Sequence, residues 1–185
     1  MTPEPIAPSP ENGPRDRSIT QARDAALRFI SYRPRSEAEV RRRLSPQYPE
    51  PIIEQVIASL RVQGFLDDAA FARLWRNHRE RLRPRGQRRL RQELARLGVD
   101  RETTDAALEG FDEGENAYRA GQKYTRSLRN RAITQGITEE VFRQRLWGYL
   151  QRRGFSYGVA AEVAQRLWPE LAADPLRGQD YAEDD

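Results

Sequence analysis

Short amphipathic helices recur along this chain, and their apolar positions return about every fifty residues. The matching positions fall into two sets, Leu44, Leu94 and Leu150, and then Leu60, Phe111 and Leu167, which lie 16, 17 and 17 residues further on. A three-helix unit of this size buries too little surface to fold alone, so neighbouring units are expected to pack end to end. The pattern predicts an all-α fold of tandem three-helix repeats forming an elongated curved array. A compact helical bundle is the alternative.

The first repeat indicates how the helices begin and end. Apolar residues at helical spacing stop before Pro34, and Ser36 with Glu39 three residues later predicts a capping box that begins the second helix. Pro51 stands where the first turn of a third helix tolerates proline, and the apolar run that follows ends before Gly64. The same pattern restarts near residue 67.

These signals divide the chain into five segments. A Pro-rich tail covers residues 1–18, three-helix repeats cover 19–65, 66–112 and 113–171, and an acidic tail covers 172–185. Both tails are expected to be disordered, because they cannot bury enough apolar surface to offset the entropy lost on ordering. In the third repeat, Gly114 and Gly121 weaken the apolar pattern of the first helix.

Composition excludes several classes of site. The chain has no cysteine, so it forms neither a disulfide nor a thiolate metal site, and no apolar run approaches the ~20 residues that cross a bilayer. We therefore expect a cytoplasmic protein without a membrane anchor. Asp67 and Asp68 stand where a helix begins and are interpreted as caps. His78 is interpreted as a residue packed at the edge of the core, and without a second histidine it completes no site.

Positive charge is concentrated in one segment. Residues 71–99 contain ten arginines against two glutamates, a net charge of +8 in a chain whose total is +4. Such a cluster favours an extended polyanion or an acidic protein surface as the partner, although any single arginine can simply be solvated. The residues that we predict to bind a partner or DNA are Arg76, Arg79, Arg83, Arg85, Arg88, Arg89 and Arg91.

Two faces are expected on the helix that begins near Asp67. Phe71 and Trp75 are assigned to the inward face, together with Leu74, His78 and Leu82, whereas Arg76, Arg79 and Arg83 are assigned to an outward stripe. The tryptophans Trp75, Trp147 and Trp168 are interpreted as core residues, although aromatic rings also stack on exposed bases. Tyr157 is the aromatic residue with the least buried setting.

Three motifs resemble the RecX family. They are Arg33-Pro-Arg-Ser-Glu-Ala-Glu-Val-Arg-Arg-Arg-Leu44, Gly64-Phe-Leu-Asp-Asp-Ala-Ala-Phe-Ala72, and Arg83-Pro-Arg-Gly-Gln-Arg-Arg-Leu-Arg-Gln-Glu-Leu94 followed by Gly98-Val99. Near the end, Leu150-Gln-Arg-Arg-Gly-Phe-Ser-Tyr157 resembles the C-terminal repeat of that family. The ordered combination covers residues 22 to 168.

The resemblance implies a regulator, usually an inhibitor, of the RecA recombinase. Such a protein lies in the groove of the RecA filament on DNA and limits filament growth, ATP hydrolysis and strand exchange, and thereby affects recombination, DNA repair and the SOS response. The implied partners are RecA and, more weakly and with salt dependence, single- and double-stranded DNA. We expect a monomer that is not an enzyme, with no catalytic residues, no metal and no cofactor.

An autonomous DNA- or RNA-binding or architectural protein is the alternative function. In that case the two basic helices act on nucleic acid without a recombinase. Comparable affinity for naked DNA and for RecA filaments favours this alternative.

Overall fold

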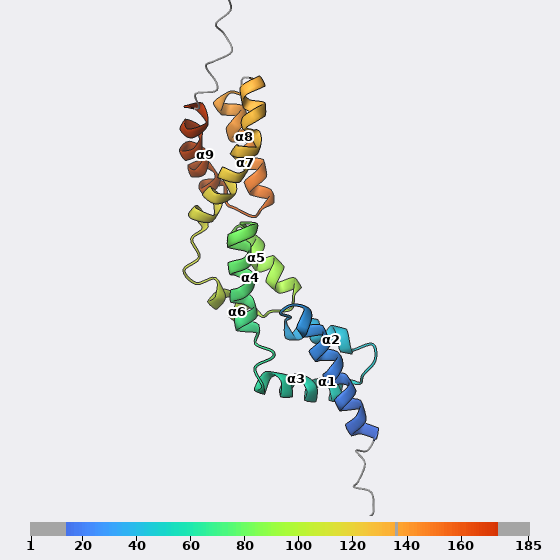
Figure 1. Cartoon of the computed structure of the whole chain (residues 1–185). Helices are drawn as coiled ribbons and strands as arrows, with labels where there is room; N and C mark the ends of the chain where they lie inside the picture. Colours follow the sequence, from blue (N-terminus) through green and yellow to red (C-terminus); the bar gives the residue numbers. More distant parts are fainter. Residues whose placement is uncertain (1–13, 136, 174–185) are drawn as a thin grey trace, which may run out of the picture. The chain divides into compact units, whose positions relative to one another are not determined.

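The computed structural model describes residues 14–135 and 137–173, and the regular secondary structure in these ranges is entirely helical. The helices are α1 (Pro14–Tyr32), α2 (Glu37–Leu44), α3 (Glu50–Val62), α4 (Asp68–Leu82), α5 (Gln87–Arg96), α6 (Arg101–Ala107), α7 (Glu113–Gln135), α8 (Glu139–Arg152) and α9 (Tyr157–Ala172) (Figure 1). The prediction of an all-α fold is confirmed. The elongated curved arrangement of the repeats stays a prediction.

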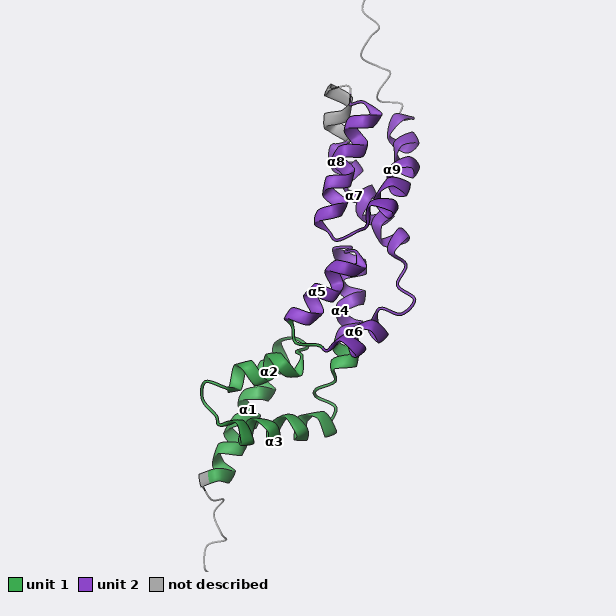
Figure 2. Cartoon of the chain, turned by 180° about the vertical axis from the view of Figure 1, so that it is seen from behind, with its two compact units in different colours: residues 1–71, 97–99 green, residues 72–96, 100–185 purple. Residues whose placement is uncertain are grey.

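The helices form two compact units. Unit 1 contains residues 1–71 and 97–99, and unit 2 contains residues 72–96 and 100–185 (Figure 2). Helix α4 crosses this division. The short turn at 97–99 therefore packs with the first unit, whereas the helices on either side of it, α5 and α6, pack with the second.

Helix α1 begins earlier than the sequence pattern predicts. Its first residue is Pro14, inside the segment 1–18 that was expected to be a disordered tail. Proline suits a first helical turn, and Ile19 packs against the apolar cluster of unit 1 one turn before Ala22. The tail prediction is therefore wrong for residues 14–18. The remainder of the two tails, residues 1–13 and 174–185, lies outside the described residues.

Unit 1 is built on an apolar cluster shared by α1, α2 and α3. The cluster consists of Ala22, Ala26, Val40, Leu44, Ile52, Ile53, Val56, Ile57, Leu60 and Leu66. The predicted capping box of α2 is confirmed, since the Ser36 hydroxyl and the Glu39 carboxylate each accept the other residue's backbone N–H. Asp68 also accepts the N–H of Glu37, and Asp67 accepts the N–H of Ala70. Asp67 therefore caps α4, as predicted, whereas the described bond of Asp68 caps the start of α2, which the sequence did not predict.

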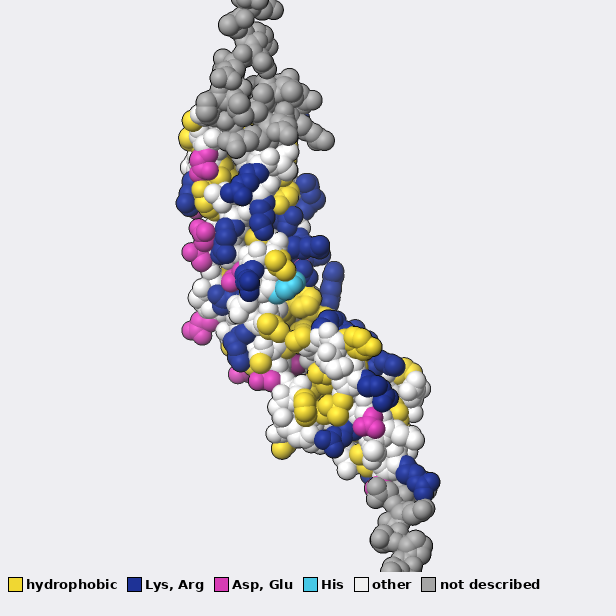
Figure 3. All heavy atoms as spheres, in the orientation of Figure 1, with side chains coloured by type: hydrophobic (Ala, Val, Ile, Leu, Met, Phe, Trp, Pro, Cys, Tyr) yellow, Lys and Arg dark blue, Asp and Glu magenta, His cyan; other side chains and the backbone are white. Residues whose placement is uncertain are grey.

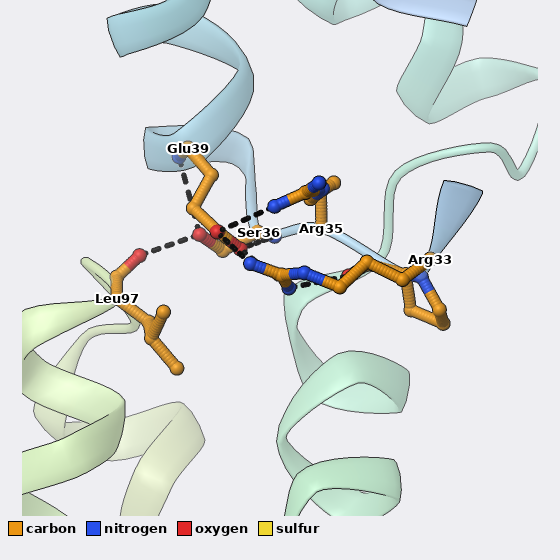
Figure 4. Close-up of polar contacts among 6 residues, drawn as sticks. Arg33, Arg35, Ser36, Glu39 and Leu97 are labelled. Carbon is orange, nitrogen blue, oxygen red and sulfur yellow. Dashed lines mark hydrogen bonds and ion pairs between the residues drawn. The ribbon is translucent and has the colours of Figure 1, made fainter. Parts of the chain in front are cut away.

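The turn at 97–99 docks on the start of α2. The buried hydroxyl of Ser36 donates a hydrogen bond to the carbonyl oxygen of Leu97 (Figure 4). Gly98 has a φ of +82°, and a Cβ at this position would lie 2.2 Å from the Cβ of Ala38. Glycine is therefore required here both for the left-handed backbone and for the close approach.

The core of unit 2 lies among α7, α8 and α9. Its buried residues are Ala117, Ala120, Ile137, Phe142, Leu146, Leu150, Phe155, Ala160, Val163, Ala164, Leu167 and Leu171. Gly121, which weakens the apolar pattern in the sequence, lies in the contact between α7 and α9. A Cβ on Gly121 would come within 2.6 Å of Leu167 and 2.9 Å of Val163. Small residues therefore let these two helices pack closely.

A second docking turn joins α5 to the end of α8 within unit 2. The backbone N–H of Gly86 donates to the carbonyl oxygen of Arg153 at 2.9 Å. Gly154 has a φ of +86°, and a Cβ on it would lie 2.5 Å from the Cβ of Arg89. This arrangement repeats the one in unit 1, because Gly86 and Ser36 both follow an Arg-Pro-Arg sequence and both contact the residue before a left-handed glycine.

Candidate functional site

The seven predicted binding arginines lie on α4, on the loop that follows it and on α5, all within unit 2. Figure 3 shows Lys and Arg side chains gathered over the α4–α5 part of the molecule, with the single histidine among them. The structure separates the seven residues into those held by internal contacts and those directed to solvent.

Glu93 of α5 is the centre of the internal set. One of its carboxylate oxygens, Oε2, accepts hydrogen bonds from Nε of Arg79 at 2.8 Å and from the indole N–H of Trp75 at 3.0 Å. The other oxygen, Oε1, lies 3.8 Å from Nε of Arg85 and 3.6 Å from Nε of Arg89. The side chain of Glu93 is only 11% exposed. Three guanidinium groups therefore share one partly buried carboxylate and leave an excess of positive charge.

Arg85 shows the electrostatic consequence of this crowding. Burial, and next the positive charge of Arg153, lower the pKa of Arg85 below its ordinary value, whereas Glu93 opposes that shift. The Nε atoms of Arg85 and Arg89 are buried without a hydrogen-bond partner. In unit 1, Arg35 holds the equivalent place after proline and pairs with Glu39 at 3.3 Å. The second arginine of each Arg-Pro-Arg sequence is therefore anchored to the helix that follows it.

Arg76 fastens α4 to the end of α6. Its guanidinium donates to the carbonyl oxygens of Ala107 at 3.0 Å and of Glu109 at 2.8 Å, and it pairs with Glu80 at 2.9 Å. Carbonyl groups at a helix C-terminus lack partners within the helix and favour a cation. Arg76 thus satisfies carbonyl groups at the end of a short helix.

The two faces expected on α4 are correct only in part, since Phe71 is buried and Arg83 is exposed as expected, whereas the other assignments differ. Arg79 lies 4.6 Å above the ring of Trp75, on the side that contacts α5, whereas His78 is exposed and Leu74 and Leu82 are 50% and 59% exposed. The core-edge assignment of His78 is therefore wrong. Both stripes have helical spacing, and the apolar stems of arginine can replace leucine against a neighbouring helix. The pattern of residue types did not reveal which stripe faces inward.

Three of the seven arginines are available to a partner. Arg83 and Arg88 are exposed, and among the described residues neither has an ion pair. Arg91 pairs with Asp105 at 3.0 Å, but both side chains are nearly half exposed, so the pair contributes little to stability. Arg81, at the end of α4, is also exposed. Binding by any of the seven arginines stays a prediction.

An aromatic pair next to these arginines was not included in the predicted site. Trp147 of α8 and Tyr157 of α9 are 38% and 71% exposed, and their ring centroids are 6.1 Å apart. We call this pair the aromatic rim. The assignment of Trp147 to the core is wrong, because the buried stripe of α8 runs through Phe142 and Leu146 and Trp147 follows one residue later. Its position off that stripe is the sequence signal of its exposure.

Two hollows border the aromatic rim. The first, of about 350 Å³, also contacts Arg88, Arg91 and Gln151. The second, of about 440 Å³, also contacts Arg143. The rim therefore lies beside the outward arginines of α5.

The described residues contain no group of three or more His, Cys, Asp or Glu side chains arranged to hold a metal ion. In the same ranges, no helix has the length and apolar content that a membrane span requires.

Three family models match the chain in order. They describe the first, second and third three-helix domains of RecX, and they match residues 22–60, 67–108 and 112–164. The crystal structure of RecX from Lactobacillus salivarius resembles the fold with a TM-score of 0.70 and 22% sequence identity, covering 82% of this chain and 97% of that one.

Curated relatives agree with the domain matches. Regulatory protein RecX of Mycobacterium avium is 35% identical over 158 residues, which is 85% of this chain and 88% of the relative. Regulatory protein RecX of Chlorobium limicola is 32% identical over 163 residues, which is 86% of this chain and 99% of the relative. With all three domains matched in order and relatives aligned over nearly their whole length, the chain belongs to the RecX family of regulatory proteins.

Proposed function

We propose that this protein regulates the RecA recombinase in the cytoplasm, as an inhibitor that lies in the groove of the RecA–DNA filament. In this role it limits filament growth, ATP hydrolysis and strand exchange, and so restrains recombination, DNA repair and the SOS response. The observation that carries the proposal is the ordered match to all three RecX domains over residues 22–164. Regulation by occupancy requires no catalysis and no cofactor on this chain.

The outward side chains support two kinds of contact. Arg83 and Arg88 are exposed and have no ion pair with a described residue, and guanidinium groups bind phosphate oxygens or carboxylates through paired hydrogen bonds. Leu74 and Leu82 form an exposed apolar stripe on α4, and apolar side chains of this kind occur in the centre of protein interfaces. The internal arginines around Glu93 add positive charge that attracts both partners over a distance.

The experiment follows ATP hydrolysis by RecA on single-stranded DNA while this protein is added, with binding to free DNA measured in the same buffer. We expect hydrolysis to fall at concentrations that leave naked DNA unbound. If hydrolysis is unchanged, or falls only as the protein coats the DNA, the RecA proposal is wrong and the autonomous nucleic-acid binder takes its place.

A pair of double variants tests the outward arginines. Replacing Arg83→Ala together with Arg88→Ala is expected to raise the concentration needed for inhibition about tenfold, which corresponds to about 0.7 kcal/mol for each arginine. The matched control replaces Arg42→Ala together with Arg43→Ala on α2, which are also exposed and remove the same charge. Equal effects of the two double variants would show that only net charge matters.

A further inference from the structure

The aromatic rim presents exposed ring surface to solvent, since Trp147 is 38% and Tyr157 71% exposed. The rings of Trp147 and Tyr157 meet at an interplanar angle of 73°, edge to face, so they do not stack on each other. A different pair in unit 2, Tyr124 and Tyr149, lies at 22° with centroids 4.4 Å apart and does stack. The edge of one rim ring therefore covers one face of the other, and the exposed ring surface, most of it on Tyr157, is open to a further planar group.

The positions next to the two rings are glycines. Gly158 follows Tyr157, and a Cβ there would meet nothing within 4 Å. Gly148 follows Trp147, and a Cβ there would meet only the end of the Arg152 side chain, at 3.4 Å. A planar group can thus approach either ring with little obstruction from the adjacent backbone.

The two hollows beside the rim combine cations with amide groups. In the first hollow, Arg88 has no ion pair within the described part of the chain, and Gln87 and Gln151 supply side-chain amides. In the second, Gln144 and Gln165 line the wall together with Arg143, whose guanidinium pairs with Glu139 at 2.5 Å. Volumes of about 350 and 440 Å³ lie within the range of small-ligand sites, in which amides contact polar edges and arginines contact phosphates.

Each hollow also contains one carboxylate. Glu140 lines the second hollow, and Glu113 lines the first, where its Oε1 accepts the backbone N–H of Gln87 at 3.0 Å. Glu113 is thus partly neutralised by the start of α5. Arg91 pairs with Asp105, so Arg88 is the cation of the first hollow that is expected to hold a phosphate.

We propose that the aromatic rim stacks on the bases of single-stranded nucleic acid, with Arg88 holding an adjacent phosphate. Aromatic faces beside a basic groove are the elements that bind single strands without sequence preference. A duplex does not satisfy this geometry, because its bases are already stacked inside the helix. The inference rests on the DNA contact in the proposed function and assigns that contact to particular residues, Arg88 of the second repeat and Trp147 and Tyr157 of the third.

The test uses the full chain without RecA, so it can fail independently of the regulatory proposal. Binding of a labelled oligothymidylate of about ten nucleotides is measured by fluorescence anisotropy, together with an abasic strand of equal length and charge. We expect Trp147→Ala with Tyr157→Ala to weaken oligothymidylate binding about tenfold and to leave abasic-strand binding unchanged. The salt dependence should stay the same, since no phosphate contact is removed.

Two further variants separate stacking from folding and from charge. Tyr157→Phe retains the ring and should bind like the wild type, whereas Tyr32→Ala removes an exposed tyrosine of unit 1 and should also bind like the wild type. Arg88→Ala should weaken both strands and reduce the slope of log affinity against log salt by about 0.7.

Four results would overturn the assignment. In the first, the wild type binds the oligothymidylate and the abasic strand with equal affinity. In the second, the double aromatic variant binds oligothymidylate within about twofold of the wild type. In the third, the double aromatic variant loses affinity for both strands to the same extent. Equal displacement of both strands by an Asp- and Glu-rich peptide would identify a general anion surface, and would also overturn it.

Discussion

The α4–α6 and α7–α9 parts of unit 2 are held together by different interactions. Helices α7–α9 share a cluster of twelve buried apolar residues. In α4–α6, the buried apolar residues Leu90, Leu94, Ala107 and Leu108 are accompanied by a carboxylate, Glu93, that binds three arginines and a tryptophan. The difference shows that a dense arginine cluster can form part of a domain's internal structure, so its density alone does not define a binding site.

The largest expected effect comes from removing a buried apolar side chain from the α7–α9 core. Phe142 is fully buried in α8, and Phe142→Ala should lower the free energy of unfolding by about 4 kcal/mol, because it removes the ring and leaves a cavity. Urea unfolding at low and high salt measures the loss. We expect the same loss at both salt concentrations, and a strong salt dependence would contradict an apolar origin.

The next effect comes from disrupting the close contact of Gly154 with Arg89, which connects the α4–α6 and α7–α9 parts of unit 2. Gly154→Ala forces an alanine into the left-handed region and places its Cβ 2.5 Å from the Cβ of Arg89. We expect a loss of about 3 kcal/mol, which combines backbone strain with overpacking. Gly158→Ala, at an open position on the same side of unit 2, is the control and should change stability by less than about 0.5 kcal/mol. Equal effects would show that the close approach is not needed.

A smaller effect comes from removing the carboxylate that the arginines of α4–α6 share. Glu93→Ala leaves Arg79, Arg85 and Arg89 without their shared carboxylate, and we expect a loss of about 2 kcal/mol at low salt. Added salt should reduce this loss, because it screens the repulsion among the arginines. Glu102→Ala, an exposed glutamate of α6, serves as the control. The contrast between the two parts of unit 2 is refuted if the Glu93 and Phe142 variants respond to salt in the same way.

The smallest effect concerns pH. Hydrogen bonds from the backbone N–H and the side chain of Thr103 hold the pKa of Asp100 below its ordinary value. A carboxylate with a lowered folded-state pKa stabilises the fold above its unfolded-state pKa, and this contribution is lost as the pH falls through the folded-state pKa. Asp100→Asn should therefore reduce the stability difference between pH 6 and pH 3, values on either side of the ordinary pKa of about 4. Thermal unfolding at both pH values checks this expectation, and an unchanged difference would contradict it.

Local signals in the sequence were sufficient to predict much of the fold. The Ser36–Glu39 capping box and the Asp67 cap follow from short-range hydrogen bonding, which depends on a few neighbouring residues, whereas the bond from the Glu37 N–H to Asp68 joins positions far apart in the sequence and was not predicted. The start of α1 at Pro14 has no signal in the apolar pattern, because residues 14–18 contain no apolar side chain other than proline.

The candidate site was less predictable because it depends on how α4 is rotated about its axis. Members of both stripes lie inward, since Phe71 is buried and Arg79 contacts Glu93 of α5. Members of both are also exposed, namely Leu74, Leu82 and Arg83. The two occurrences of Arg-Pro-Arg contained a usable signal. A motif that recurs in equivalent places of two repeats indicates a shared structural role, as Arg35 and Arg85 have.

The repeated docking turns also determine the order in which contacts form as the chain leaves the ribosome. The apolar cluster of the first repeat is complete once Leu66 has emerged, yet its Ser36 has no Leu97 carbonyl to bind until thirty-one more residues follow. Likewise, the backbone N–H of Gly86 can donate to the carbonyl oxygen of Arg153 only after sixty-seven more residues have been synthesised. Each new repeat thus completes the one before it, and a chain halted partway retains one unpaired docking loop.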